Sequence, residues 1–155
     1  MPLQERQASR GNHTYNAIVA AYKVMMRRMA DMLSEEKLTQ PQFQALRIVA
    51  KNHEVCMREI GDEMFVTAAN ITGIIDRLES RGLLRRTGRK GDRRTTNIEL
   101  TPEGMELQER VVERYNEFIQ DALRVFTQEE QEKLSELLLK LQEGMSHPEK
   151  ATARL

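Results

Sequence analysis

Residues 57–100 read MREIGDEMFVTAANITGIIDRLESRGLLRRTGRKGDRRTTNIEL, and this stretch decides the fold. Residues 57–64 show a pattern of two helical turns, and residues 65–66 are a turn. Thr67 is placed to cap a longer helix, because a threonine in this position accepts a hydrogen bond from a free backbone amide. The apolar residues of that helix recur with helical spacing at Ile71, Ile74, Ile75 and Leu78. Two helices joined by a short turn are typical of a helix-turn-helix.

The second half of the stretch predicts a β-hairpin. Gly82 ends the preceding helix, and the strand patterns of residues 83–87 and 95–100 flank a seven-residue loop, 88–94. Four cationic residues and two glycines in this loop suit contact with phosphates or with the narrow minor groove of DNA. Asp92 is the one acid there, and we expect it to pair with an arginine and fix the shape of the loop. Such a hairpin is the wing of a winged helix-turn-helix.

Long amphipathic helices are predicted on both sides of this unit. Apolar residues recur at helical spacing over residues 12–34, whereas residues 1–11 are polar and expected to be loosely ordered. Thr39 and Gln42 form a capping-box pattern at the start of a further helix. Residues 102–145 carry two more helical patterns, which Thr101 and Thr127 are placed to cap. The fold class is therefore mainly α with a small β-wing, in a single domain of residues 1–155.

Composition and charge exclude several classes of protein. The 155 residues, 39% hydrophobic, suit one compact domain. No run of about 18 apolar residues occurs and the N-terminus is polar, so we expect neither a membrane span nor export. The single cysteine, Cys56, fits a reducing cytoplasm. The net charge of zero hides an uneven distribution, because residues 76–94 carry a net charge of +5 and residues 102–143 a net charge of −6.

The face of the predicted helix opposite its isoleucines is suited to reading DNA. It presents small or short polar residues near its N-terminal end, which permit a close approach in a major groove about 12 Å wide. Asparagine side chains can pair with adenine, and alanine or threonine methyl groups can touch thymine. The residues of this face are Ala69, Asn70, Thr72, Gly73, Asp76 and Arg77. The alternative is a solvated face with no partner.

As a set, three motifs resemble the MarR family of transcription regulators. The first is Leu38-Thr39-Gln40-Pro41-Gln42-Phe43-Gln44-Ala45-Leu46, and the second is Asp76-Arg77-Leu78-Glu79 followed by Gly82-Leu83-Leu84. The third is Gly91-Asp92-Arg93-Arg94, which leads to Leu100-Thr101-Pro102-Glu103-Gly104 and is similar to the family's wing signature. The resemblance covers residues 15–145.

The resemblance implies a homodimer that binds double-stranded DNA. Residues 12–34 and 102–145 would be dimerisation helices, and residues 38–100 a winged helix-turn-helix lobe with its recognition helix in the major groove. The wing arginine of the family reaches the minor groove and its aspartate orients that arginine, so Arg94 and Asp92 inherit these roles. The implied DNA-binding residues are Thr67, Ala68, Ala69, Asn70, Thr72, Arg77, Lys90, Asp92, Arg93 and Arg94.

Many members of the family also bind a small aromatic or lipophilic acid. By helix faces, Tyr15, Tyr22, Met26 and Arg47 are the candidates for lining such a pocket, with core or interface packing as the alternative role. Cys56 lies outside the position of the reactive cysteine in the peroxide-sensing members, so we interpret it as a packing residue. His53 and Cys56 have no further ligands at metal-binding spacing, and we expect no metal or cofactor.

The leading expectation is a sequence-specific DNA-binding regulator that acts as a repressor, and two other functions compete with it. An architectural, weakly specific DNA-coating protein also uses small winged dimers, and it would show steep salt dependence with little preference for sequence. An enzyme is the third alternative. The sequence contains no recognisable catalytic motif and no glycine-rich loop between a strand and a helix, so we expect no enzymatic activity.

Overall fold

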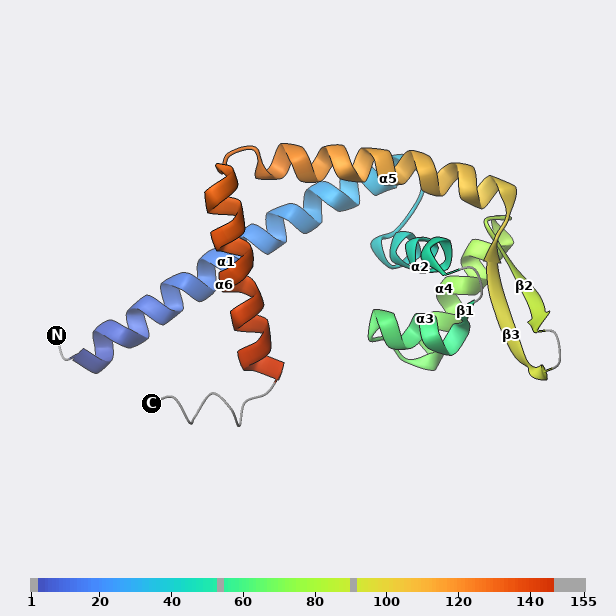
Figure 1. Ribbon diagram of the computed structural model, residues 1–155, viewed down its shortest axis with the longest axis horizontal. Helices are drawn as coiled ribbons and strands as arrows, with labels where there is room; N and C mark the ends of the chain where they lie inside the picture. The colour runs from blue at the N-terminus through green and yellow to red at the C-terminus, as the bar shows by residue number, and fades with distance from the viewer. Residues whose placement is uncertain (1–2, 53–54, 90–91, 147–155) are drawn as a thin grey trace. The chain divides into compact units, whose positions relative to one another are not determined.

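The computed structural model describes residues 3–52, 55–89 and 92–146 (Figure 1), and within them the side chains of residues 11–52, 55–88 and 96–146. The helices are α1 (Leu3–Glu35), α2 (Gln40–Lys51), α3 (Met57–Met64), α4 (Ala68–Ser80), α5 (Pro102–Leu123) and α6 (Gln128–Ser146). The strands are β1 (Val55–Cys56), β2 (Leu84–Arg89) and β3 (Asp92–Leu100). The fold is thus mainly helical with a small antiparallel sheet, as the sequence predicts.

The chain divides into two compact units, residues 1–116 and residues 117–155, and the boundary lies within α5. The core of the first unit is aliphatic. Residues at its centre are completely enclosed, among them Leu33 of α1, Leu46 of α2, Ile60 of α3 and Ile75 of α4. These four come from four different helices, so the lobe is held by packing between elements rather than within any one of them.

The sheet has the strand order β1-β3-β2, with both pairs antiparallel. Val55 of β1 lies opposite Ile98, and Leu84 of β2 lies opposite Leu100. The hairpin differs from the sequence prediction, because β2 continues to Arg89 and β3 begins at Asp92, with an irregularity in register between Gly88 and Arg89. The predicted seven-residue loop was therefore too long. The two strands pair through residues such as Gly88 and Arg89, which the sequence pattern assigned to the loop because they are glycine or charged.

Helix α1 also differs from the prediction, since it starts at Leu3 and not near Asn12. Its first turns lack the apolar periodicity on which the predicted start depended, but residues such as glutamine, glutamate and arginine favour a helix without it. The other predicted helix starts are confirmed. Thr39 and Gln42 form the capping box of α2, with the Thr39 amide donating to Oε1 of Gln42 at 2.9 Å.

Three residues, Gly82, Thr101 and Gly104, connect the end of α4, the sheet and the start of α5. Thr101 caps α5 by accepting from the Gly104 amide at 3.0 Å, and its hydroxyl donates to the carbonyl of Gly82 at 2.5 Å. Gly82 has a φ of 71°, which glycine adopts without strain. A Cβ on Gly104 would overlap the carbonyl oxygen of Leu83, so only glycine allows α5 to start this close to the link. The Leu-Thr-x-x-Gly motif therefore has a structural role.

The second unit contains the end of α5 and the whole of α6. Thr127 caps α6 by accepting from the Glu130 amide at 3.3 Å, while Glu130 accepts from the Thr127 amide at 2.8 Å, so the predicted capping box is present. No residue of α6 is buried. Its large apolar side chains are exposed at Leu137, Leu138, Leu139, Leu141 and Met145.

Candidate nucleic-acid interface

Helix α4 is anchored at its start by a cap and a tight turn. The Thr67 hydroxyl accepts from the Asn70 amide at 3.4 Å, as the sequence predicts. Phe65, in the turn before it, adopts the left-handed conformation with a φ of 54°, and its side chain is 96% exposed. Ile71, Ile74, Ile75 and Leu78 are buried, which fixes the rotation of α4 about its own axis.

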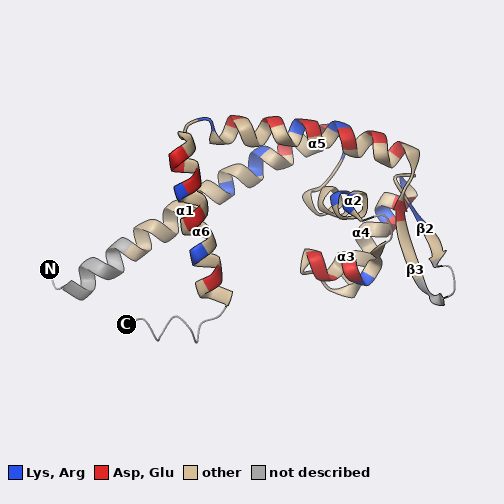
Figure 2. Ribbon diagram, viewed as in Figure 1, with Lys and Arg blue, Asp and Glu red and all other residues tan. Residues whose placement is uncertain are grey.

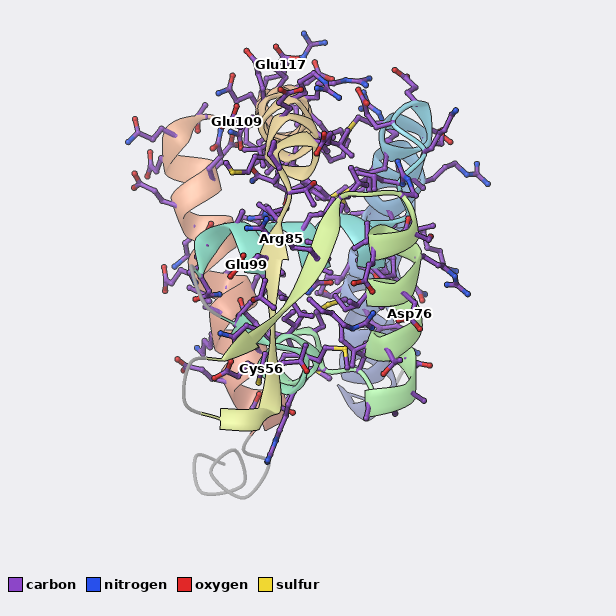
Figure 3. The ribbon with its side chains drawn as sticks, turned by 90° about the vertical axis from the view of Figure 1, so that its right-hand side faces the viewer. Cys56, Asp76, Arg85, Glu99, Glu109 and Glu117 are labelled. Atoms are coloured by element: carbon purple, nitrogen blue, oxygen red, sulfur yellow. The ribbon has the colours of Figure 1, made fainter. Side chains whose placement is uncertain are left out.

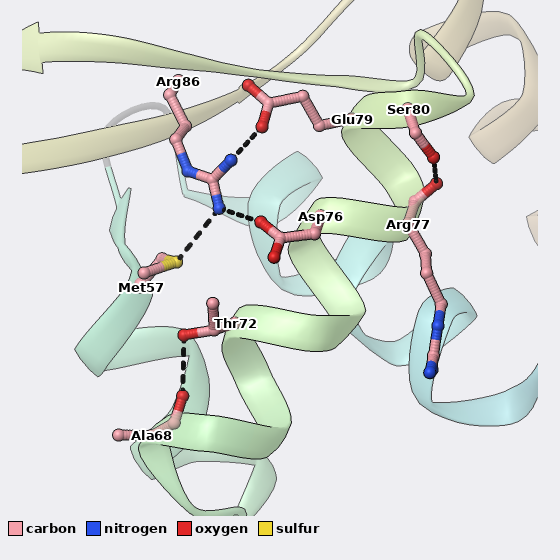
Figure 4. Close-up of polar contacts among 8 residues, drawn as sticks. All are labelled: Met57, Ala68, Thr72, Asp76, Arg77, Glu79, Ser80 and Arg86. Atoms are coloured by element: carbon pink, nitrogen blue, oxygen red, sulfur yellow. Dashed lines mark hydrogen bonds and ion pairs between the residues drawn. The ribbon is translucent and has the colours of Figure 1, made fainter.

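The sequence-predicted reading residues lie on the open side of this helix. Ala68, Ala69, Asn70 and Arg77 are exposed, and Thr72 is half-buried. The Thr72 hydroxyl donates to the carbonyl of Ala68 at 2.8 Å, which leaves its methyl group and both acceptor lone pairs for an outside partner. Figure 4 shows that Thr72 and Asp76 lie on one side of α4 and Arg77 on the other.

Arg86 of β2 binds both carboxylates of α4. It donates to Oδ1 of Asp76 at 2.5 Å and to Oε2 of Glu79, and it contacts the sulfur of Met57 at 3.9 Å (Figure 4). The hydrogen bond to Asp76 is the main cause that raises the pKa of Arg86 above its ordinary value. This clamp joins α4 to β2 of the hairpin and compensates two negative charges beside the open face of the helix. The sequence pattern does not predict it, because spacings of seven and ten residues across a turn follow no local rule.

Other arginines of the basic stretch also serve the fold. Arg85 donates to Glu99 across the two strands at 2.9 and 3.1 Å (Figure 3), and Arg81 donates to the carbonyls of Lys37 and Glu36 at 2.6 and 3.2 Å. Arg77 makes no ion pair with the described residues, and its side chain is exposed. The charge of +5 therefore overstates the free positive charge near α4.

Arg77 shares a hollow of about 350 Å³ with Asn70 and with Pro41 at the start of α2. The predicted wing contacts lie at residues that the structure does not describe in full. Lys90 lies outside the described residues, and so do the side chains of Asp92, Arg93 and Arg94, whose backbone belongs to β3. In Figure 2 the acidic residues follow α5 and α6, whereas basic residues mark the start of β2.

The four residues predicted to line a ligand pocket do not surround one hollow. Arg47 lies 4.9 Å from the ring centre of Tyr115 and 5.7 Å from that of Phe43, and it lines a hollow of about 600 Å³ between α2, α3 and α5. Tyr15 and Tyr22 are exposed on α1. Met26 accepts from Nε2 of Gln40 at 3.2 Å. The residues around the Arg47 hollow do not include the other three candidates.

The described part of the chain also bears on metal binding and on membrane insertion. Its histidine, cysteine and acidic residues form no group of three or more that could hold a metal ion, and His53 lies outside the described residues. The described helices include none with the length and apolarity needed to cross a bilayer. Cys56 carries a free thiol, and its amide donates to Oε2 of Glu59 at 2.8 Å.

Comparison with known proteins assigns the family. The sequence model of the MarR family matches residues 38–96, which span α2, α3, α4 and the wing. The chain is 35% identical over 115 residues to the HTH-type transcriptional regulator PecS of Dickeya dadantii, a match that covers 72% of this chain and 69% of PecS. The chain belongs to the MarR family. It is therefore a transcriptional regulator of the helix-turn-helix type and not an enzyme.

Solved structures of MarR-type regulators share this fold. A mutant of Escherichia coli MarR in complex with operator DNA superposes with a TM-score of 0.75 at 22% identity, over 91% of this chain and 99% of that one. BpsR of Bordetella bronchiseptica, whose DNA binding is regulated by 6-hydroxynicotinic acid, superposes with a TM-score of 0.72 at 24% identity. That match covers 82% of this chain and 91% of BpsR. The MarR fold thus extends well beyond the residues that the family model matches.

Proposed function

We propose that the protein is a homodimeric, sequence-specific DNA-binding repressor that reads a palindromic operator. The observation that carries this proposal is the open face of α4, with its short side chains and a start that is capped and rigid. Such a face fits a major groove, and the wing at the other end of the lobe fits the neighbouring minor groove. The operator complex of E. coli MarR, which shares the fold, supports this use of the lobe.

The proposed contacts divide into reading and anchoring residues. Asn70, with Ala69 and Thr72, reads base edges, whereas Arg77 and the cations of the wing bind the backbone and the minor groove. The full proposed set on α4 is Thr67, Ala68, Ala69, Asn70, Thr72 and Arg77. On the wing it is Lys90, Asp92, Arg93 and Arg94.

A second copy of the chain is the proposed partner of the exposed apolar residues on the long helices. Tyr15 and Tyr22 on α1 and the leucines of α6 are exposed in the single chain. A palindromic operator requires two recognition helices about 34 Å apart, and a dimer held by long helices provides such a separation. Light scattering is expected to give twice the chain mass of 18.0 kDa.

Selection of bound fragments from a random DNA library tests the function directly. A palindromic consensus with half-sites one helical turn apart is the expected result. Enrichment without a consensus, together with a steep salt dependence, would favour an architectural DNA-coating protein instead. On the selected operator, Arg94→Ala is expected to weaken binding strongly without unfolding the lobe. Asn70→Ala is expected to relax base preference, and equal losses on operator and random DNA would assign Asn70 to the backbone.

Repression and release are tested with the same operator. A reporter promoter that overlaps the operator is expected to lose transcription when the protein is present, and a gain would make the protein an activator. We also propose a small aromatic or lipophilic acid as effector, because the Arg47 guanidinium beside Tyr115 offers a charge and a ring. A ligand that prefers a dimer with the wrong helix separation lowers operator affinity. Release by 6-hydroxynicotinic acid, the regulator of BpsR, is the first measurement, with Arg47→Gln as the variant that should resist it.

A further inference from the structure

Arg58, the second residue of α3, is a cation that adds little to the stability of the lobe. Its side chain is 89% exposed, and its ion pair with Asp62 is loose, with 3.7 Å between Nε and Oδ2. An exposed pair of this kind contributes little, and a cation placed four residues before the acid is the less favourable order. A positive charge in the first turn also opposes the helix dipole. Arg58 thus carries a charge that the fold does not require.

The first residues of α3 lie between α4 and the hairpin. Met57 contacts the guanidinium of Arg86 on β2 at 3.9 Å, on the side of α4 where Thr72 lies (Figure 4). Arg58 follows Met57 in the chain and lines a hollow of about 340 Å³ together with Ala68 and Thr72. The latter two belong to the residues of α4 that are proposed to bind DNA. Arg58 therefore stands at the edge of the proposed DNA-binding face, on the side of the hairpin.

A sugar-phosphate backbone passes this edge when the lobe binds DNA as proposed. A major groove has one backbone on each side, and one of the two separates it from the minor groove into which the wing reaches. With α4 in the major groove, this separating backbone crosses the region between α4 and the hairpin, where Arg58 lies. The other backbone runs on the far side of α4, where Arg77 lines a hollow with Pro41 of α2. Each backbone thus meets one exposed arginine.

Two other arginines near the hairpin are held more tightly by the fold. Arg86 is bound by two carboxylates of α4, and Arg85 donates to Glu99 at 2.9 Å. Glu99 also lines a hollow against α5, so the Arg85 pair lies away from α4. The pair of Arg58 is longer than a hydrogen bond, and its guanidinium can turn to a phosphate oxygen without giving one up.

We propose that Arg58 binds a phosphate of the backbone that separates the major groove at α4 from the minor groove at the wing. This inference rests on the proposed function of α4 as the recognition helix, and it adds a contact that the sequence motifs do not include. The contact is a charge-assisted hydrogen bond from the guanidinium to a phosphate oxygen. It carries no information on the base sequence and instead fixes the position of α4 in the groove.

Binding to operator and to random DNA over a range of salt concentrations measures this contact. Arg58→Gln is expected to lower affinity by the same factor on both DNAs, because a phosphate contact is independent of sequence. With two such contacts in a dimer, the slope of log affinity against log salt should become shallower by about 1.8. The ratio of wild-type to variant affinity should therefore fall by about twelvefold between roughly 50 and 200 mM salt. The melting temperature should not fall, since the side chain is exposed.

Two matched variants serve as controls. Arg85→Gln removes the same charge from the lobe and also takes the arginine away from one carboxylate, but on the side towards α5. Its affinity should stay within about twofold of the wild type, because salt screens charges that do not touch the DNA. Asp62→Asn breaks the Arg58 pair and keeps the cation, so it should bind at least as tightly as the wild type.

Neutral phosphates in the DNA identify the contact. Each phosphate of one half-site is replaced in turn by a methylphosphonate, which has no negative charge. At one position on the separating backbone, the wild type and Arg85→Gln are expected to lose affinity, whereas Arg58→Gln should change by less than about twofold. A general attraction between charges, or a structural role of Arg58, would not produce this pattern.

Three results overturn the inference. The first is an equal loss of affinity in Arg58→Gln and Arg85→Gln, which would make the effect one of net charge. The second is a loss on operator DNA alone, and the third is the absence of any phosphate whose replacement removes the difference between wild type and Arg58→Gln. If the wild type does not prefer any operator to random DNA, the proposed sequence-specific function fails, while the salt dependence on random DNA still tests Arg58. The two failures are therefore distinguishable.

Discussion

The leucines of the winged lobe and those of α6 have opposite environments. Leu46 and Leu78 are 0% exposed in the first unit, whereas Leu137 is 51% and Leu139 is 59% exposed in the second. Burying a leucine stabilises a fold by about 1.5–3 kcal/mol. The lobe has gained this free energy within its own chain, but α6 has not. The difference indicates that the lobe is a self-sufficient unit and that α6 depends on a partner surface, for which we propose a second copy of the chain.

The largest effect is expected from Leu46→Ala in the lobe. Removal of this enclosed side chain leaves a cavity, and the free energy of unfolding is expected to fall by about 2–5 kcal/mol. Urea denaturation measures it, with the exposed Gln44→Ala in the same helix as control. The loss should be the same at every protein concentration, and a loss that vanishes at high concentration would mean that the lobe is not self-sufficient.

Leu138→Ala makes the same truncation in α6, where the leucines are exposed. The lobe is expected to keep its unfolding free energy, while the dissociation constant of the dimer rises by about tenfold, because the lost contact belongs to the interface. Analytical ultracentrifugation over a range of concentrations measures this constant, with Lys140→Ala as control. A loss of stability as large as that of Leu46→Ala, and independent of concentration, would contradict the comparison.

Arg86→Gln removes the positive charge that pairs with Asp76 and Glu79, and it therefore tests the contribution of charge in the lobe rather than that of packing. Arg86, Asp76 and Glu79 are all partly exposed, so the loss of stability is expected to stay below about 1 kcal/mol. Operator affinity is expected to fall more, by about fivefold at low salt, since two carboxylates beside the proposed DNA-binding face lose their counter-charge. Arg85→Gln, which breaks a pair on the wing with a single carboxylate, is the control. Equal losses of affinity in the two variants would remove the special role of the clamp.

Glu136→Gln on α6 is expected to have the smallest effect. The Lys133 ammonium, by its hydrogen bond, lowers the pKa of Glu136 from 4.5. A carboxylate with a lowered pKa contributes stability above its unfolded pKa and loses it as the pH falls through the folded value. The difference in melting temperature between wild type and variant, measured by circular dichroism, should therefore be slight at pH 7 and disappear as the pH falls below 4.5 and through the lowered pKa of Glu136. It should also vanish in 1 M salt; persistence there would assign it to packing.

Local rules predicted the elements of this fold well. Thr39, Thr67, Thr101 and Thr127 each accept from the backbone amide that the sequence pattern assigned to them, because a cap needs only a side chain and its neighbours. Contacts between distant elements were not predictable in this way. The ion pairs of Arg86 and the hydrogen bonds from Arg81 to the two carbonyls that follow α1 depend on how helices and strands pack.

The candidate site was predictable in part for the same reason. Helical spacing correctly placed Ala69, Asn70 and Arg77 on the open side of α4, since burial of the isoleucines determines which side is open. Spacing could not distinguish arginines that meet DNA from arginines that hold the fold. Strand pairing beyond Thr87 was missed because glycine and charge in a sequence resemble a loop until a partner strand supplies hydrogen bonds.

The hydrogen bond between Thr101 and Gly82 brings together two residues that are 19 positions apart in the chain. The hairpin between them therefore leaves α4 and returns to α5 at almost the same point. The half of the hairpin next to the helices packs into the core through Leu84 and Ile98. Beyond Thr87 the paired strands extend away from the point where the hydrogen bond of Thr101 joins the two ends of the hairpin. A hairpin anchored in this way can be shortened, lengthened or exchanged for one from another regulator without a change in the path of the chain. We therefore expect that the hairpin can be exchanged at this point without unfolding the lobe, which would allow the proposed minor-groove contacts to be tested in chimaeric regulators.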